Sequence, residues 1–206
     1  MNVGQEKVWD NIARSWREFR QKIPPTVEKF ISEKKGKILD MGCGSGRNFR
    51  KINGLRWYGV DFSKEMIAFA EEDAEKRGIS VNLKKAPAED LPFEDNYFDA
   101  VLMYAVIHCI DSVAKRKKAL KEIYRVLKPG AEAIVSSWGP KSPRLKNKEK
   151  ECFVPWTSRD GKDRTERYTY IYDLDELVEL CKKVGFEIVN SWEERNVNVI
   201  VRKPTS

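Results

Sequence analysis

Residues 38–46 read ILDMGCGSG, an apolar strand that runs directly into three alternating glycines. Glycines at the end of a strand allow a tight turn and a close approach of the backbone to a ligand, and the N-terminus of a following helix offers unpaired N–H groups. A purely structural turn is one alternative. A dinucleotide site is another, although such sites carry G-x-G-x-x-G rather than the G-x-G-x-G found here. The segment predicts a ligand-binding strand end in an α/β fold.

Strands and helices alternate on both sides of this segment. Apolar runs indicate strands, and apolar residues at three- to four-residue steps indicate helices. Ser63 should cap the third helix, Gly78 should end it, and Asp173 with Glu176 should form a capping pair on the last helix. We expect strands over residues 37–39, 56–60, 81–84, 98–104, 131–137, 186–190 and 197–202, and helices over residues 8–23, 26–33, 63–77, 113–127 and 173–184.

This order of elements predicts an α/β, Rossmann-like architecture. Strands that alternate with helices form a mostly parallel sheet with helices on both faces, here of about seven strands with an antiparallel edge hairpin. A chain of 206 residues is typical of one domain, and residues 1–35 would form N-terminal lid helices within it. Residues 139–172 show little periodicity, so we expect this insertion to contact the substrate.

The composition excludes several classes of protein. No apolar run approaches the roughly 20 residues that cross a bilayer, and the N-terminus lacks the features of a secretory signal. We therefore expect a cytoplasmic protein without a membrane partner. Four cysteines lie singly, without C-x-x-C spacing, which predicts neither a metal site nor a disulfide framework. The net charge of +7 favours a polyanionic partner, or reflects a solvated lysine-rich surface.

Two acidic residues narrow the choice of ligand. Asp40 lies two residues before the first glycine, where a carboxylate would repel a pyrophosphate but would hold the ammonium group of a methionine moiety. Asp61 ends the second strand, about 20 residues further on, where a carboxylate accepts both hydroxyls of a ribose. Parallel strands bind ligands at their carboxyl ends, so residues 86–93 and 104–110 should complete the same site.

These four strand ends, in this order, resemble those of the class I S-adenosylmethionine-dependent methyltransferases, over residues 8–202. The resemblance implies S-adenosyl-L-methionine as the cofactor. Many members carry Asp where this chain has Pro87, so the backbone N–H of Ala88 or the side chain of Glu89 should contribute more to adenine binding. The resemblance places the methionine part among Asp40, Gly42, Gly44 and Gly46, the ribose on Asp61, the adenine beside Ala88 and Glu89, and Tyr104 on the reactive side.

A narrower resemblance lies outside the cofactor motifs. The pairing of V-P-W (154–156) with R-Y-x-Y (167–170) is its most discriminating part. It implies tRNA as the acceptor, and relatives of these enzymes use a small zinc-binding activator protein. The segments VWDNIARSWREFRQK (8–22), FDAVLMYAVIHCI (98–110), SSWGP (136–140) and FVPWTSRDGKDRTERYTYIYDLDEL (153–177) are similar to tRNA methyltransferases that esterify the carboxymethyl group on the wobble uridine of the anticodon loop.

The composition of the insertion favours RNA as well. Basic side chains follow a phosphate backbone while aromatic rings stack on splayed bases, as a single-stranded loop requires. A solvated loop over an apolar lid is the alternative, and five acidic residues dilute the charge. The basic residues are Lys141, Arg144, Lys146, Lys148, Lys150, Arg159, Lys162, Arg164 and Arg167, and the aromatic ones are Phe153, Trp156, Tyr168 and Tyr170.

The expected acceptor decides which residues the reaction needs. A carboxylate is ionised at neutral pH and requires no general base, so positioning should dominate. Arg20, Trp138 and Arg167 fall in the matching segments and are the candidates to hold it, with Tyr168 as a helper. The alternative for the two arginines is a surface or helix-capping charge, and for Trp138 it is core packing.

His108, the single histidine, follows the fourth strand, where class I enzymes face their acceptor. With a phenol, carbon or amine acceptor it would act as a base, so a small-molecule methyltransferase of the quinone or metabolite type is the rival. With a carboxylate it orients the substrate or simply packs. A non-catalytic binder of the donor or of RNA is a further alternative, against which the intact glycines and acids argue. Trp9 and Trp16 lie on a helical stripe and are assigned to the core.

Overall fold

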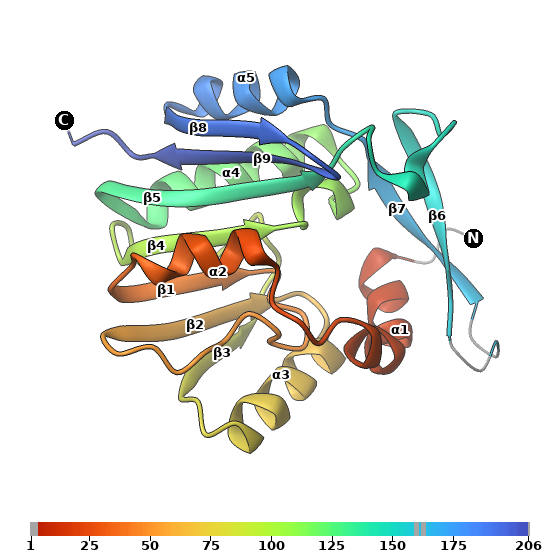
Figure 1. The fold of residues 1–206 in the computed structure, drawn as a ribbon, viewed down its shortest axis with the longest axis horizontal. Coiled ribbons are helices and arrows are strands. Elements are labelled where there is room, and N and C mark those ends of the chain that lie inside the picture. The colour runs from red at the N-terminus through yellow and green to blue at the C-terminus, as the bar shows by residue number, and fades with distance from the viewer. Residues whose placement is uncertain (1–3, 159–160, 162–163, 206) are drawn as a thin grey trace.

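The computed structural model describes residues 4–158, 161 and 164–205, and Figure 1 shows a central sheet between helices. Its seven strands follow the order β3-β2-β1-β4-β5-β9-β8. Strands β3 to β5 are parallel, whereas β9 is antiparallel to both β5 and β8. This confirms the Rossmann-like fold with its edge hairpin. The strands are β1 (Gly36–Met41), β2 (Leu55–Asp61), β3 (Val81–Lys85), β4 (Phe98–Tyr104), β5 (Leu127–Trp138), β8 (Glu187–Glu193) and β9 (Asn196–Arg202).

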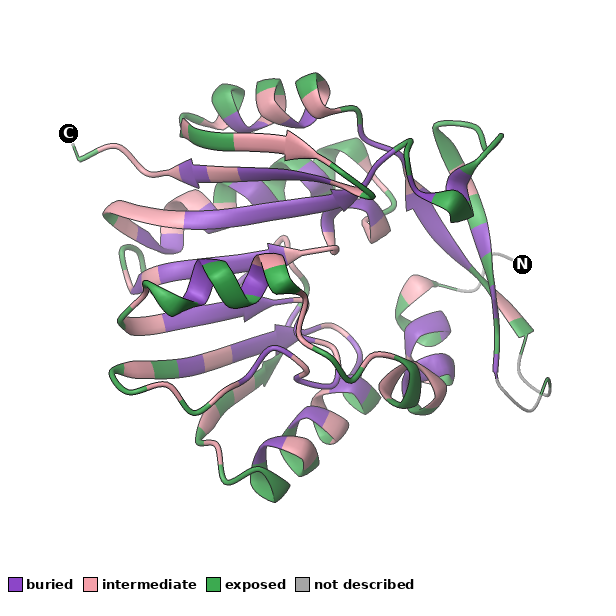
Figure 2. Ribbon diagram, viewed as in Figure 1, coloured by how far each residue is buried: buried purple, intermediate pink, exposed green. Residues whose placement is uncertain are grey.

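Helices cover both faces of this sheet, and Figure 2 shows the central strands largely buried between them. On one face Phe30 of α2 belongs to the same buried cluster as Trp57 of β2. On the other face Leu120 of α4 belongs to a cluster with Val101 of β4. Burying each such side chain stabilises the fold by about 1.5–3 kcal/mol. The first face carries α2 (Pro25–Ser32) and α3 (Lys64–Lys76), and the second carries α4 (Val113–Val126) and α5 (Leu174–Val184).

A third group of elements lies beyond the carboxyl ends of the parallel strands (Figure 1). It consists of α1 (Gln5–Phe19) and a two-stranded antiparallel sheet of β6 (Glu151–Thr157) and β7 (Arg164–Tyr170). Helix and hairpin are joined by hydrogen bonds, because Trp156 Nε1 donates to Ser15 Oγ at 2.8 Å and Tyr168 N donates to Gln5 Oε1 at 3.0 Å. They therefore cover the edge of the sheet where ligands of this fold bind.

The β6–β7 hairpin was not expected from the sequence, because residues 139–172 show little periodicity. In β6 the buried residues Val154 and Trp156 do alternate with exposed ones, but only over a few residues and on either side of Pro155. Proline is rare inside sheets, yet it is tolerated here because the isolated two-stranded sheet consists of edge strands. Arg159 and Lys162, two of the expected basic residues, lie outside the described residues.

Some helix ends also differ from the prediction. The first helix ends at Phe19 rather than continuing to Ile23, because Ile23 instead packs against the cluster under α2. Asp173 occupies the N-cap position of α5 without a side-chain capping bond, and Glu176 accepts a hydrogen bond from the hydroxyl of Tyr170 instead. The predicted capping pair is therefore wrong. The predicted cap of α3 is confirmed, since Met66 N donates to Ser63 Oγ at 3.1 Å.

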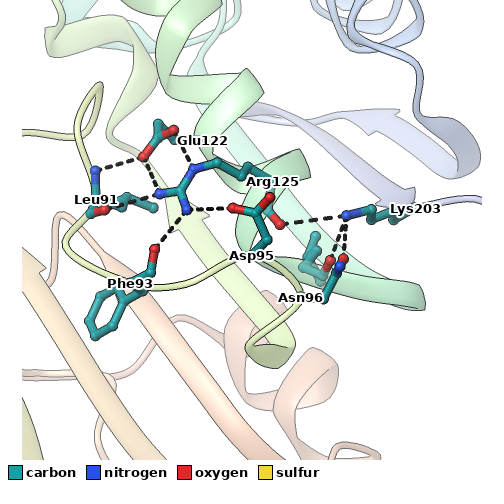
Figure 3. A network of polar contacts seen from close by, with 8 residues as sticks. Leu91, Phe93, Asp95, Asn96, Glu122, Arg125 and Lys203 are labelled. Atoms are coloured by element: carbon teal, nitrogen blue, oxygen red, sulfur yellow. Dashed lines mark hydrogen bonds and ion pairs between the residues drawn. The ribbon is translucent and has the colours of Figure 1, made fainter.

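The loop between β3 and β4 is held by a polar network around Arg125 of α4, in which Glu122 also accepts a hydrogen bond from Leu91 N (Figure 3). The Arg125 guanidinium donates to the carbonyl oxygens of Leu91 and Phe93, at 3.0 and 2.7 Å. It also forms ion pairs with Glu122 and Asp95. This network holds the segment that contains the expected adenine-binding residues. In the described part of the chain, no helix is both long enough and apolar enough to cross a membrane.

Candidate active site

A cleft of 1280 Å³ opens at the carboxyl ends of the parallel strands, under α1 and the hairpin. Asp40, Gly46 and the predicted helper Tyr168 do not line it, whereas the other predicted site residues do. The fold therefore brings together side chains from segments that are far apart in the sequence. The predicted residues in its wall are Arg20, Gly42, Gly44, Asp61, Ala88, Glu89, Tyr104, His108, Trp138 and Arg167.

The glycine turn forms the floor of this cleft. At Gly44, an added Cβ would be in ordinary contact with Met66 Sδ at 3.9 Å and Trp16 Nε1 at 4.0 Å, but φ is +53°, a conformation that favours glycine, and the residue lines the cleft. At Gly42 an added Cβ would lie 2.5 Å from Val106 Cγ2, and at Gly46 it would lie 2.7 Å from Phe49 Cε2. Gly46 is thus required for packing. The turn provides a cradle for a ligand at Gly44.

No helix follows the glycines, contrary to the expectation that a helix N-terminus would bind the ligand. Residues 42–49 are turns, in which Phe49 N donates to Gly46 O at 3.2 Å. The carbonyl oxygens of this segment accept hydrogen bonds from side chains rather than from the next helical turn. Arg50 Nη1 donates to Phe49 O at 2.7 Å and Arg77 Nη2 donates to Gly46 O at 2.8 Å.

Asp61 lies beside the cradle at the end of β2. Its two carboxylate oxygens accept Gly44 N at 2.9 Å and Ser63 N at 3.0 Å. Burial raises the pKa of this carboxyl group to about 6. Each carboxylate oxygen retains a second lone pair, so Asp61 can still accept hydroxyl groups from a ligand in the cleft. The chemistry of this residue and of Gly44 fits a ribose at this position.

Asp40 lies below the cleft rather than in its wall. Its side chain is buried and accepts a hydrogen bond from Asn48 Nδ2 at 3.0 Å. Burial raises the pKa of Asp40 to about 7. Asp40 thus lies behind the wall of the cleft at the end of β1, and its predicted contact with an ammonium group stays a prediction. Asn48, which does line the cleft, stands between Asp40 and the open space.

On the opposite side of the cleft, Arg167 is enclosed by tryptophan rings. It is 2% exposed, and its Nε and Nη2 atoms have no hydrogen-bond partner among the described residues. Burial lowers its pKa to about 10, a shift that reflects the unfavourable environment of the charge. An uncompensated buried cation of this kind is suited to an anionic ligand. The guanidinium carbon lies 5.1–5.6 Å from the ring centres of Trp9, Trp16, Trp138 and Trp156.

Two further arginines surround the same space. Arg20 Nε is buried and has no hydrogen-bond partner in the part of the chain that the structure describes, and burial lowers the pKa of Arg20 to about 10. Arg144 lies over the rings of Phe19 and Trp138, at 5.5 and 5.9 Å. Neither arginine has an ion-pair partner in the described part of the chain. This side of the cleft is therefore strongly cationic, with aromatic walls.

His108 stacks on Trp138, with ring centres 4.9 Å apart, and its Nδ1 accepts a hydrogen bond from Trp138 N at 3.4 Å. Burial, together with the charges of Arg167 and Arg20, lowers the pKa of His108 to about 3. The imidazole is therefore neutral at physiological pH. A base whose conjugate acid is so strong deprotonates a phenol or carbon acid poorly.

The structure also places residues in the cleft that the sequence reading left out. Trp9 and Trp16 both pack in a cluster with Ile12 and line the cleft. The same helical stripe therefore contributes to the core and to the wall of the cleft. Arg144 and Arg47 line it too, and the position of Arg47 directly after the glycines was the available signal.

Other predicted residues lie elsewhere. Tyr168 does not line the cleft, because its hydroxyl accepts Arg116 Nη1 at 3.0 Å. Lys141 pairs with Glu193, and Lys150 pairs with residues of α5, so neither is a free basic residue.

The chain is similar in sequence to known methyltransferases. A family model described as a methyltransferase domain matches residues 39–135. A protein named as a methyltransferase in Encephalitozoon cuniculi is 29% identical over 96% of this chain and 94% of its own length. The 2-phytyl-1,4-naphtoquinone methyltransferase of Nostoc punctiforme is 29% identical over 95% of this chain and 86% of its own length.

Two tRNA methyltransferases are similar over a smaller share of their length. The protein of Mus musculus named as tRNA methyltransferase 9B is 28% identical over 72% of this chain. The tRNA (carboxymethyluridine(34)-5-O)-methyltransferase of Arabidopsis thaliana is 27% identical over 76% of this chain. The matched regions span 32% and 36% of those two proteins.

Solved structures share the fold. An S-adenosylmethionine-dependent methyltransferase of Methanosarcina mazei is 25% identical, with a TM-score of 0.69 over 90% of this chain and 100% of that one. A complex between the Haloferax volcanii Trm112 methyltransferase activator and a methyltransferase matches at 18% identity, with a TM-score of 0.68 over 97% of this chain and 96% of that chain. With the strand order, the glycine cradle and these relatives in agreement, the protein is a class I methyltransferase that uses S-adenosyl-L-methionine.

Proposed function

We propose that this enzyme transfers the methyl group to the carboxylate of a carboxymethyl group on the wobble uridine of tRNA, which forms a methyl ester. The observation that carries the proposal is Arg167, a buried guanidinium with two unpartnered N–H groups inside a cage of tryptophan rings. Such a group fits a planar anion, because a guanidinium donates two parallel hydrogen bonds to a carboxylate. The similarity to two tRNA methyltransferases supports tRNA as the carrier of that anion.

The donor site in this proposal is the half of the cleft nearest the glycine cradle. Asp61 accepts the ribose hydroxyls, Gly44 gives the backbone room to approach the donor, and Ala88 and Glu89 border the adenine. Tyr104 lies at the end of β4, between this half and the arginines. When bound, S-adenosyl-L-methionine supplies an electrophilic methyl group on a sulfonium.

The acceptor half of the cleft positions the acceptor and does not deprotonate it. A carboxylate is already ionised at neutral pH, so the chain needs no base, which agrees with the low pKa of His108. Arg167 and Arg20 hold and orient the carboxylate, and Trp138 forms the wall behind it. The surrounding rings exclude water and strengthen these charge interactions. Correct alignment of the reacting atoms then accounts for most of the acceleration.

The rest of the tRNA would lie along the hairpin. Phe153 on β6 is 43% exposed, and Lys146, Lys148 and Arg164 are exposed basic residues at its ends. An exposed aromatic ring among cations is suited to an unpaired base and its phosphates.

We also propose a small zinc-binding activator protein as a partner, because a solved complex of the same fold contains a Trm112 activator. Co-purification on a sizing column, with and without such an activator, tests this part. Elution of the two proteins as separate peaks would contradict it.

The rival function is methylation of a quinone or another small molecule, favoured by the relative from Nostoc punctiforme. A phenol or carbon acceptor of that kind needs a base, and the buried, neutral His108 is a weak one. Methylation of a quinone would therefore lack the base that it requires, whereas methylation of a carboxylate requires no base.

Labelled donor separates the two functions. The protein is incubated with tRNA that carries the carboxymethyl group, with the same tRNA lacking it, and with a quinone precursor. We expect label only in the first tRNA. Equal labelling of both tRNAs would contradict the acceptor assignment, and label in the organic extract would favour the rival.

A further inference from the structure

One buried polar atom in the cleft has no role in the chemistry described above. Asn198 on β9 is 2% exposed and lines the cleft, and its Oδ1 has no hydrogen-bond partner in residues 4–158, 161 and 164–205. Buried polar groups are nearly always paired, because leaving one unpaired costs free energy. An acceptor that remains unpaired in the wall of a substrate cleft indicates a donor on the ligand.

The orientation of this amide is determined by its neighbour. Asn198 Nδ2 donates to Asn196 O at 3.0 Å. Exchanging the nitrogen and oxygen of the amide would set two acceptors against each other, so the network assigns Oδ1 to the unpaired position. Asn198 therefore presents an acceptor, and not a donor, to the cleft.

The strand register places this acceptor at a useful distance from the donor half. Asn198 pairs with Ser136 of β5, and Ser136 pairs with Tyr104 of β4. Adjacent strands are about 4.8 Å apart, so Asn198 lies roughly 10 Å across the sheet from Tyr104. Trp138, which borders the arginines, pairs with Asn196 on the same strand. The space beside Asn198 is thus next to the acceptor half and away from the glycine cradle.

We propose that Asn198 Oδ1 accepts the ring N–H of the uracil base, so that this residue determines which base the enzyme methylates. This inference rests on the proposed function. The imide edge of uracil presents one N–H between two carbonyl oxygens, whereas cytosine presents a bare ring nitrogen at the same place. Oδ1 attracts the former and repels the latter. Asn198 therefore selects a uracil over a cytosine that carries the same carboxymethyl group.

The carbonyl oxygens of the imide edge also require donors. Arg20 Nε is a buried donor in the same cleft and has no partner within the described residues. The cleft thus supplies both kinds of group that the edge of a uracil needs.

Calorimetric binding of free nucleosides tests this inference separately from catalysis. The ligands are 5-carboxymethyluridine, its derivative with a methyl group on the ring nitrogen, and 5-carboxymethylcytidine, each titrated into protein saturated with S-adenosylhomocysteine. In the wild-type protein we expect the first ligand to bind about tenfold more tightly than either of the others, as the loss of one hydrogen bond predicts.

The variant Asn198→Ala should bind 5-carboxymethyluridine about tenfold more weakly and should no longer distinguish the ring-methylated ligand. Asn190→Ala is the matched control, because Asn190 lies on the adjacent strand β8, is exposed and does not line the cleft. It should behave as the wild type. If the Asn198 variant fails to fold, the ligand comparison in the wild-type protein still decides.

Equal affinity of the wild-type protein for the three nucleosides, or no binding of any, would overturn the role of Asn198. Discrimination among the nucleosides combined with an unmethylated tRNA would instead contradict the proposed reaction while supporting the base contact. The two failures are therefore distinguishable.

Discussion

Arg167 is a buried cation that forms no ion pair with any of the described residues. Burial lowers its pKa to about 10, and the surrounding tryptophan rings compensate only part of the lost hydration. A side chain that destabilises the free protein in this way is retained where function needs it. This burial supports our proposal that the charge of Arg167 binds an anionic ligand.

Replacing Arg167 with Met should separate these two effects. We expect kcat/KM for the tRNA acceptor to fall by about a hundredfold, because a buried anion would lose its partner. The melting temperature should not fall, since an apolar side chain replaces an unpaired charge. Arg56→Met, at an exposed position of β2 that does not line the cleft, is the control. Full activity of the Arg167 variant would show that the acceptor carboxylate binds elsewhere.

Asp61 makes donor binding depend on pH. Its pKa of about 6 in the free protein lies above the ordinary value, so the folded protein takes up a proton as the pH falls through 6. This proton uptake favours the folded state at lower pH, but it removes the carboxylate that accepts ribose hydroxyls. We expect donor affinity to be about tenfold weaker at pH 5 than at pH 8. Calorimetry on wild type and Asp61→Asn checks this, and equal pH dependence of both would exclude Asp61.

His108 should leave no trace in the pH profile of catalysis. Because its pKa is about 3, the imidazole stays neutral between pH 6 and 8. With saturating donor, single-turnover rates should be constant over that range. A rate that rises through an ordinary histidine pKa would assign His108 the role of a base and would revive the small-molecule rival.

At the scale of elements, apolar runs predicted the strands well, because the fully buried strands of a parallel sheet are apolar on both faces. Residues 98–104 form β4 with the predicted ends, and Ser63 caps α3 as expected. The hairpin of β6 and β7 escaped prediction, since its burial depends on α1, which is distant in the sequence. The direction of Asp40 likewise depends on tertiary packing.

Arg125 links the adenine loop to α4, so its removal should affect both stability and donor binding (Figure 3). For Arg125→Gln we expect a melting temperature lower by about 5 °C, as the loss of several hydrogen bonds predicts. Donor affinity should fall by a few-fold, because the loop that contains Ala88 and Glu89 loosens. Arg125→Lys keeps the charge but not the paired N–H donors of the guanidinium, so its melting temperature and donor affinity should lie between those of the wild type and Arg125→Gln. An unchanged donor affinity in Arg125→Gln would show that the anchoring of this loop does not affect donor binding.

At the scale of the whole molecule, the site exists only because distant segments meet. Arg20 follows α1, His108 follows β4, Trp138 ends β5 and Arg167 lies on β7. The sequence identified these residues through a resemblance, but the cage around Arg167 and the unpartnered Asn198 required the three-dimensional arrangement. The sequence also could not show which basic residues of the insertion are free, because Lys141 and Lys150 form ion pairs with other parts of the protein.

We propose that the methyl group is transferred to a carboxylate on tRNA. Mass spectrometry of nucleosides from treated tRNA, before and after mild alkali, tests this proposal, because alkali cleaves methyl esters and leaves carbon- or nitrogen-bound methyl groups intact. We expect the carboxymethylated uridine to gain one methyl group and to lose it in alkali. A methyl group that survives alkali, or that appears on another nucleoside, would contradict it.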